Sequence, residues 1–155
     1  MQVDVEYPDR KTEKDILIAT TGVEDGAVHQ VFGAEELMAA QRLVRRMPVG
    51  DSVVELILDL VRSCRPGEPE ALAVVRENVS WGPGPRAAQA LMLTVRARAL
   101  LEGRLAPSVE DVQALARPVL IHRMALNFGA RARGVQLSDV IATAVGRVAG
   151  IEAAA

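Results

Sequence analysis

Apolar residues recur at helical spacing along most of this chain of 155 residues. Val54, Ile57, Leu58 and Val61 fall at positions i, i+3, i+4 and i+7, which places them on one face of a helix. Similar apolar stripes follow over residues 85–102, 108–119 and 137–148. The pattern predicts an all-α fold, a compact bundle of six to seven short helices.

Residues that favour helix ends mark the limits of these segments. Ser52 and Glu55 have the spacing of a capping box, and Ser108 precedes an acidic first turn. Pro118 should kink or shorten the helix that contains it. The remaining segments are expected to be helical over residues 11–20, 34–47 and 123–131, and to be loops over residues 22–33 and 65–85, the second loop with one turn of helix.

The composition supports one helical domain. Half of the residues are hydrophobic and 25% are charged, so the chain can bury a core. Only 3% are aromatic, which leaves aliphatic side chains to fill that core and favours helices over sheets. These figures exclude the collagen-like, fibrous and disulfide-framework classes.

Charge is spread unevenly within a net charge of −2. Residues 1–80 hold 15 acidic and nine basic side chains, whereas residues 81–155 hold five acidic and nine basic ones. The molecule as a whole therefore has no strong attraction for nucleic acid, although its second half is basic.

Few side chains offer catalysis by themselves. Cys64 is the single cysteine; it ends an amphipathic helix, and we expect it to pack in the core. His122 is expected to be a structural hydrogen-bonding residue, and the two histidines lack the spacing of metal ligands. No apolar run approaches the ~20 residues that span a bilayer, and no secretion signal precedes the acidic start. We expect a cytoplasmic protein with no membrane partner and no metal site.

One arginine stands where a helix disfavours a cation. Arg86 follows Gly82, Pro83, Gly84 and Pro85, so it lies in the first turn of the helix expected over residues 85–102. There it faces the positive end of the helix macrodipole, at a cost of a few tenths to about 1 kcal/mol. The same end offers unpaired N–H groups to an anion, so a phosphate would relieve this cost. A carboxylate elsewhere in the fold would relieve it equally well, and spacing alone leaves both partners open.

The residues around Arg86 resemble a known signature. Residues 81–88, Trp-Gly-Pro-Gly-Pro-Arg-Ala-Ala, are similar to the Gly-Ala-Ser-Pro-Arg-Ala motif that carries the sensor 2 arginine in the C-terminal lid of MoxR-type AAA+ ATPases. Further family-like motifs follow one another in order at residues 7–10, 19–22, 96–104, 107–112, 119–123 and 126–128. The resemblance runs from residue 5 to residue 148. Pro83 and Gly84 replace the usual Ala-Ser, a change that should stiffen the loop.

The resemblance implies roles for these residues. Arg86 would contact the γ-phosphate of ATP, residues 82–85 would support it, and Tyr7 and Pro8 would form a hinge. ATP and Mg²⁺ would be bound by the full-length parent, and no cofactor is expected on the isolated lid. The phosphate-binding loop, acidic Mg²⁺ motif, sensor 1 and arginine finger of the family have no counterpart here. We therefore expect a piece of a longer ATPase, with no catalytic residues and no ATP hydrolysis of its own.

The resemblance also implies an organisation and a set of partners. Residues 1–10 would be a hinge or linker from the core, residues 11–150 the lid and residues 151–155 a tail. The lid would cover ATP and couple hydrolysis to chaperone-like remodelling of client proteins. Its partners would be its own core, neighbouring subunits of a hexameric ring and a von Willebrand factor A protein. One alternative stays open, a stand-alone helical module that binds an acidic protein or nucleic acid through its basic second half.

Overall fold

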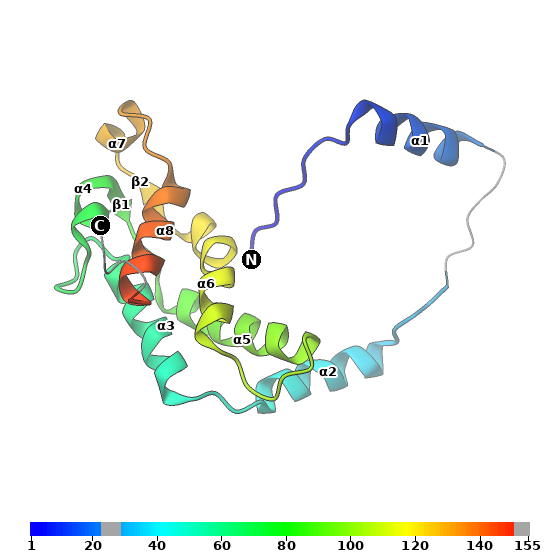
Figure 1. The fold of residues 1–155 in the computed structure, drawn as a ribbon, viewed down its shortest axis with the longest axis horizontal. Coiled ribbons are helices and arrows are strands. Elements are labelled where there is room, and N and C mark those ends of the chain that lie inside the picture. Colours follow the sequence, from blue (N-terminus) through cyan, green and yellow to red (C-terminus); the bar gives the residue numbers. More distant parts are fainter. Residues whose placement is uncertain (23–28, 151–155) are drawn as a thin grey trace.

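A computed structural model describes residues 1–22 and 29–150. Within them the chain forms eight α-helices, one short 3-10 helix (η1) and two short strands (Figure 1), so the all-α prediction is confirmed. Most of the loop predicted over residues 22–33, and the tail at 151–155, lie outside the described residues. No helix of the described part combines the length and apolar character needed to cross a membrane.

In chain order the elements are α1 (Arg10–Thr21), α2 (Ala34–Arg46), α3 (Asp51–Ser63), α4 (Ala73–Asn78), β1 (Val79–Trp81), α5 (Pro85–Leu101), α6 (Val109–Leu120), η1 (Ile121–Arg123), β2 (Ala125–Leu126), α7 (Phe128–Ala132) and α8 (Leu137–Val148).

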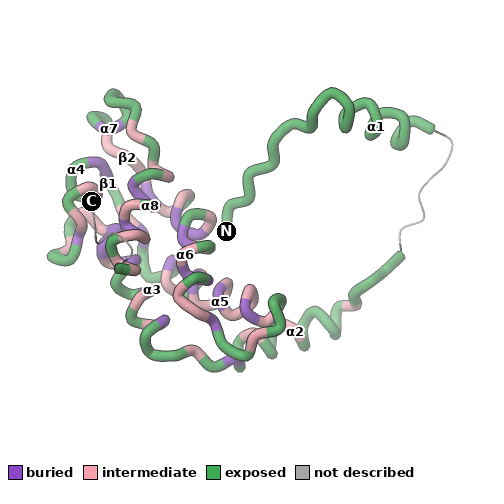
Figure 2. The backbone as a smooth tube through the Cα atoms, viewed as in Figure 1, coloured by how far each residue is buried: buried purple, intermediate pink, exposed green. Residues whose placement is uncertain are grey.

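The hydrophobic core lies where α3, α5, α6 and α8 meet (Figure 2). The central stripe comes from α5, in which Ala87, Leu91, Val95 and Ala99 are fully buried. Because residues four apart lie on one face of a helix, this stripe runs along nearly the whole of α5. Burial of each larger aliphatic side chain contributes about 1.5–3 kcal/mol. The two ends of α5 are therefore held by a packed core.

The N-terminal region is arranged differently from the bundle. α2 packs against α5, whereas α1 lies apart from the other helices (Figure 1), and every residue from 1 to 22 is exposed. The first residues contact α6. The backbone N–H of Gln2 donates to the Pro118 carbonyl at 2.7 Å, and Arg117 contacts the Asp4 carboxylate at 3.1 Å. The packed bundle consists of α2 to α8, and the domain boundary between residues 10 and 11 stays a prediction.

Helix ends confirm one predicted cap and contradict another. Ser108 forms a capping box with Asp111 at the start of α6, as its position predicts. The capping box of Ser52 with Glu55 is wrong, because α3 already begins at Asp51 and Gly50 is its N-cap residue. α6 continues through Pro118 to Leu120, where the chain tightens into η1.

The segments 65–85 and 123–131 depart most from the predictions. Within the expected loop lie α4 and β1, and β1 pairs antiparallel with β2, with Trp81 opposite Ala125. The single helix expected over residues 123–131 is wrong, because η1, β2 and α7 divide that segment. The Asn127 side chain caps α7 by accepting from the Ala130 amide at 2.8 Å and donates to the Glu77 carbonyl at 2.7 Å. These contacts bring the segment that follows α6 beside the residues that lead into α5.

Candidate functional site

The loop before α5 is fixed against the end of α3. A Cβ atom at Gly82 would lie 2.3 Å from the Cys64 carbonyl oxygen and 2.8 Å from the Arg65 Cα atom, so only glycine fits there. Pro83 is buried, and its carbonyl accepts a hydrogen bond from Arg65 Nε at 2.8 Å. The close backbone contact and this hydrogen bond hold the loop in one position relative to the core.

The first turn of α5 lacks a side-chain cap. Gly84 is the N-cap residue, and Pro85 is the first helical residue, a position where proline's missing N–H and fixed φ are favourable. The first turns of α2 and α6 carry glutamate or aspartate, whereas that of α5 carries no acidic residue. The helix end is therefore positive and has no negative side chain of its own to balance it.

Arg86 adds a cation to that uncapped end. Its side chain is exposed, and it forms no hydrogen bond or ion pair with the rest of the described chain. The carboxylate partner that spacing left open is thus absent from residues 1–22 and 29–150. The local cost of placing a guanidinium at a helix N-terminus is not offset within the described fold.

An open hollow of about 580 Å³ adjoins Arg86. Its walls come from the loop, from the first turn of α5, and from the 3-10 turn that follows α6. The lining residues are Trp81, Gly82, Gly84, Pro85, Arg86, Ala87, His122 and Arg123. This lining contains two arginines and a histidine and neither Asp nor Glu. The hollow therefore favours an anion.

His122 and Arg123 are ionisable lining residues for which the sequence predicted no binding role. They lie side by side in η1, where the Arg123 Nη1 group contacts His122 Nε2 and donates to the Val119 carbonyl at 2.5 Å. Desolvation, followed by the positive charge of Arg123, lowers the pKa of His122, which is an exposed residue. A neutral imidazole can accept from the guanidinium. That His122 is a structural hydrogen-bonding residue and not a ligand stays a prediction. Spacing could not have linked this turn to Arg86, because the link is made by the pairing of β1 with β2.

Tyr7 and Pro8, the predicted hinge, lie outside the hollow. Both are exposed residues of an extended segment, and Tyr7 is 100% exposed. Asp9, which follows them, caps α1 by accepting from the Thr12 amide at 2.8 Å. Their hinge role stays a prediction.

Cys64 belongs to the hydrophobic core, as expected. It is fully buried, and burial raises the pKa of its thiol to about 11. The thiol is therefore protonated near neutral pH and is a poor nucleophile. Among the described residues, no group of three or more His, Cys, Asp and Glu side chains is placed to hold a metal ion.

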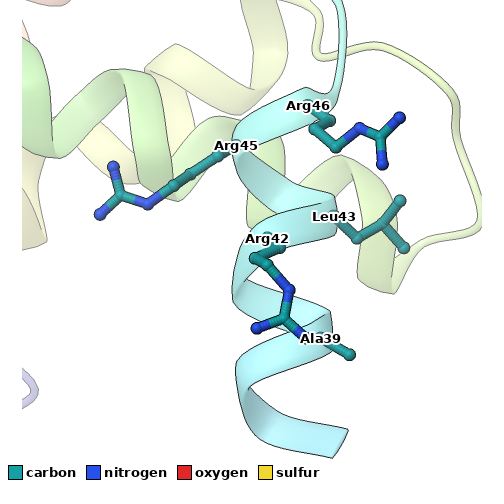
Figure 3. A pocket seen from close by; sticks show the side chains of 5 residues that line it. All are labelled: Ala39, Arg42, Leu43, Arg45 and Arg46. Atoms are coloured by element: carbon teal, nitrogen blue, oxygen red, sulfur yellow. The ribbon is translucent and has the colours of Figure 1, made fainter.

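A second basic surface lies on α2. Ala39, Arg42, Leu43, Arg45 and Arg46 line a shallow hollow there (Figure 3). All five come from one helix, and the basic side chains of its last turn suit the negative end of the macrodipole. The helix itself thus accounts for the charges of Arg45 and Arg46, in contrast to that of Arg86.

Comparison with known proteins relates this chain to a family. Residues 71–144 match the family described as AAA lid domain. Chaperone MoxR1 from Mycobacterium tuberculosis is 27% identical over 140 residues, which are 90% of this chain and 37% of the relative. The uncharacterized protein YeaC from Bacillus subtilis is 29% identical over 136 residues, 87% of this chain and 40% of the relative. The chain thus spans about two fifths of the curated relatives it matches.

A solved structure supports the fold. The crystal structure of a "putative ATPase" from Cytophaga hutchinsonii superposes with a TM-score of 0.81 at 22% identity. The match covers 91% of this chain and 43% of that one. At this identity the likeness shows the fold alone, which is the bundle that positions the hollow.

Proposed function

We propose that this chain, a lid domain of the MoxR type of AAA+ ATPase, covers ATP bound by an AAA+ core and couples hydrolysis to the remodelling of client proteins. Arg86 is its sensor 2 residue and contacts the γ-phosphate from the lid side. One observation carries the proposal: Arg86 is an exposed cation at a helix N-terminus with no partner in the described chain.

The residues of this chain bind the phosphate and position it. The guanidinium of Arg86 donates charge-assisted hydrogen bonds to phosphate oxygens and stabilises the negative charge that develops during transfer. When the γ-phosphate leaves, Arg86 loses this partner. Because the loop is fixed to α3 and α5 is packed along its length, the bundle α2–α8 then moves as one body. Tyr7 and Pro8 serve as the hinge.

Mg²⁺ has no ligands in this hollow. The ion is held in proteins by carboxylates, water and phosphate oxygens, and the lining of the hollow contains neither Asp nor Glu. The ligands of Mg²⁺ and the groups that position the attacking water therefore belong to the core. The chain alone does not hydrolyse ATP.

The partners follow from the same proposal. The lid acts in the cytoplasm, bound to its core and to neighbouring subunits of a hexameric ring, with a von Willebrand factor A protein as a further partner. Exposed apolar residues are available for such contacts: Ile16 and Leu17 on α1, and Leu37 and Met38 on α2, are 49–61% exposed. The curated relative named as a chaperone supports the remodelling role.

The proposal is tested in the ATPase that contains this lid together with its core. Arg86→Ala should lower the rate of ATP hydrolysis about a hundredfold, because one donor to the reacting phosphate is lost. Arg131→Ala, which removes an exposed arginine of α7 outside the hollow, is the matched control and should leave the rate unchanged. Hydrolysis at the wild-type rate by a folded Arg86→Ala protein would contradict the assigned role.

A further inference from the structure

The hollow at the start of α5 holds a second guanidinium besides Arg86. Arg123, from η1, lines the same hollow. We propose that Arg123 is a second phosphate-contacting residue, so that the hollow binds a polyphosphate group across two arginines instead of a single phosphate on Arg86. This inference rests on the proposed function, which assigns a phosphate contact to Arg86 alone.

Arg123 is held in place without being neutralised. Its Nη1 group donates to the Val119 carbonyl at 2.5 Å and contacts His122 Nε2. A carbonyl and a neutral imidazole both accept hydrogen bonds and carry no net charge. The positive charge of Arg123 therefore remains available, and His122 acts as a positioning residue for the guanidinium.

Some arginines of the chain are instead paired with carboxylates. Six of them form ion pairs with carboxylates in the described fold: Arg62, Arg65, Arg98, Arg104, Arg117 and Arg133. Arg86 and Arg123 have no such contact within the described residues, and no acidic residue lines the hollow between them. Two like charges on one hollow repel each other, and a multiply charged anion would reverse that cost.

The hollow also contains a fluorescent reporter. Trp81 lines the hollow, is 54% exposed, and is the single tryptophan of the chain. Its fluorescence therefore reports binding at this site. The probes are inorganic tripolyphosphate, ATP and orthophosphate, added to the 155-residue chain. Tripolyphosphate and ATP should bind with similar affinity, and orthophosphate about tenfold more weakly, because it engages one arginine at a time.

Matched glutamine variants separate the two arginines. Arg86→Gln and Arg123→Gln should each weaken tripolyphosphate binding about tenfold, whereas Arg131→Gln should leave it unchanged. Glutamine removes the charge and keeps a side-chain N–H donor. Unchanged binding by Arg123→Gln, with weakened binding by Arg86→Gln, would overturn this inference and leave the proposed function standing. Unchanged binding by Arg86→Gln would contradict both.

The unsubstituted chain gives an independent measurement. Backbone amide NMR shifts caused by tripolyphosphate should include the non-proline residues of 81–87 and also residues 121–124. Shifts confined to the first turn of α5 would overturn the two-arginine site even if Arg123→Gln failed to fold. Tighter binding of a single-stranded oligonucleotide than of tripolyphosphate would also overturn the assignment, in favour of a nucleic-acid-binding module.

Discussion

The two ends of α5 use arginine in opposite ways. At the C-terminal end, Arg98 and Arg104 contact the Asp111 carboxylate at 3.4 and 2.6 Å, and Arg104 also contacts Glu102 at 2.5 Å. At the N-terminal end, Arg86 meets no carboxylate within the described residues, and the neighbouring loop supplies none. The ends of a 17-residue helix lie about 25 Å apart, so the two arrangements are independent.

At the C-terminal end of α5 the arginines contribute to stability, whereas at the N-terminal end Arg86 is available for binding. Asp111 is 1% exposed, caps α6 through the Ser108 amide at 2.8 Å, and accepts two hydrogen bonds from Arg104. Its charge is satisfied inside the fold, and these contacts join α5 to α6. The charge of Arg86 is not satisfied there, although the backbone that carries it is held firmly. An arginine presented in this way suits a ligand that comes from outside the described fold.

The largest effect is expected where the loop meets α3. Gly82→Ala should lower the free energy of unfolding by about 3 kcal/mol, because the new Cβ would overlap the Cys64 carbonyl and force the backbone apart. Gly84→Ala is the matched control in the same loop. A Cβ atom added at Gly84 would have no neighbouring atom within 4 Å, so the loss should stay below about 1 kcal/mol. Urea unfolding measures both, and equal losses would show that the loop is not fixed at Gly82.

A smaller effect is expected at the opposite end of α5. Asp111→Asn should lower the free energy of unfolding by about 2 kcal/mol, because the charge-assisted hydrogen bonds from Arg104 are weakened. Asp139→Asn, at an exposed aspartate in the first turn of α8, is the control and should cost less than about 1 kcal/mol. If Asp111→Asn were as stable as wild type, the ion-pair network would not hold the end of α5.

The pH dependence sharpens this prediction. Hydrogen bonds from Arg104 hold the pKa of Asp111 below its usual range. A carboxyl group whose pKa is lower in the folded state stabilises the fold above its unfolded pKa, which is near 4, and this contribution is lost as the pH falls through the folded pKa. The difference in stability between wild type and Asp111→Asn should be constant near neutral pH and shrink below about pH 4. A difference that grew in acid would contradict this role.

Much of the helical fold could be predicted from the sequence, because helices are encoded locally. The apolar stripe of α5 and the Ser108 cap of α6 depend on residues within a few turns of each other. The β1–β2 pairing could not be predicted in this way, since Val79 lies opposite Leu126 and no local pattern links them. The helix expected over residues 123–131 failed for the same reason, because Asn127 is held by the distant Glu77 carbonyl.

The candidate site likewise has features that local sequence predicts and features that depend on tertiary structure. Arg86 could be singled out because its conflict with the macrodipole is a local property of the first turn. Its lack of a carboxylate partner is a tertiary property, and so is the arrival of His122 and Arg123 in the same hollow. The fit of Gly82 against the Cys64 carbonyl likewise depends on how α3 packs against the loop.

The central claim is that Arg86 is left unpaired for a phosphate bound by the core. The most direct measurement is a crystal structure of this lid joined to its AAA+ core with a non-hydrolysable ATP analogue and Mg²⁺. The account predicts an Arg86 guanidinium nitrogen about 2.9 Å from a γ-phosphate oxygen. An Arg86 side chain that pairs with a carboxylate of the core and points away from the nucleotide would contradict it.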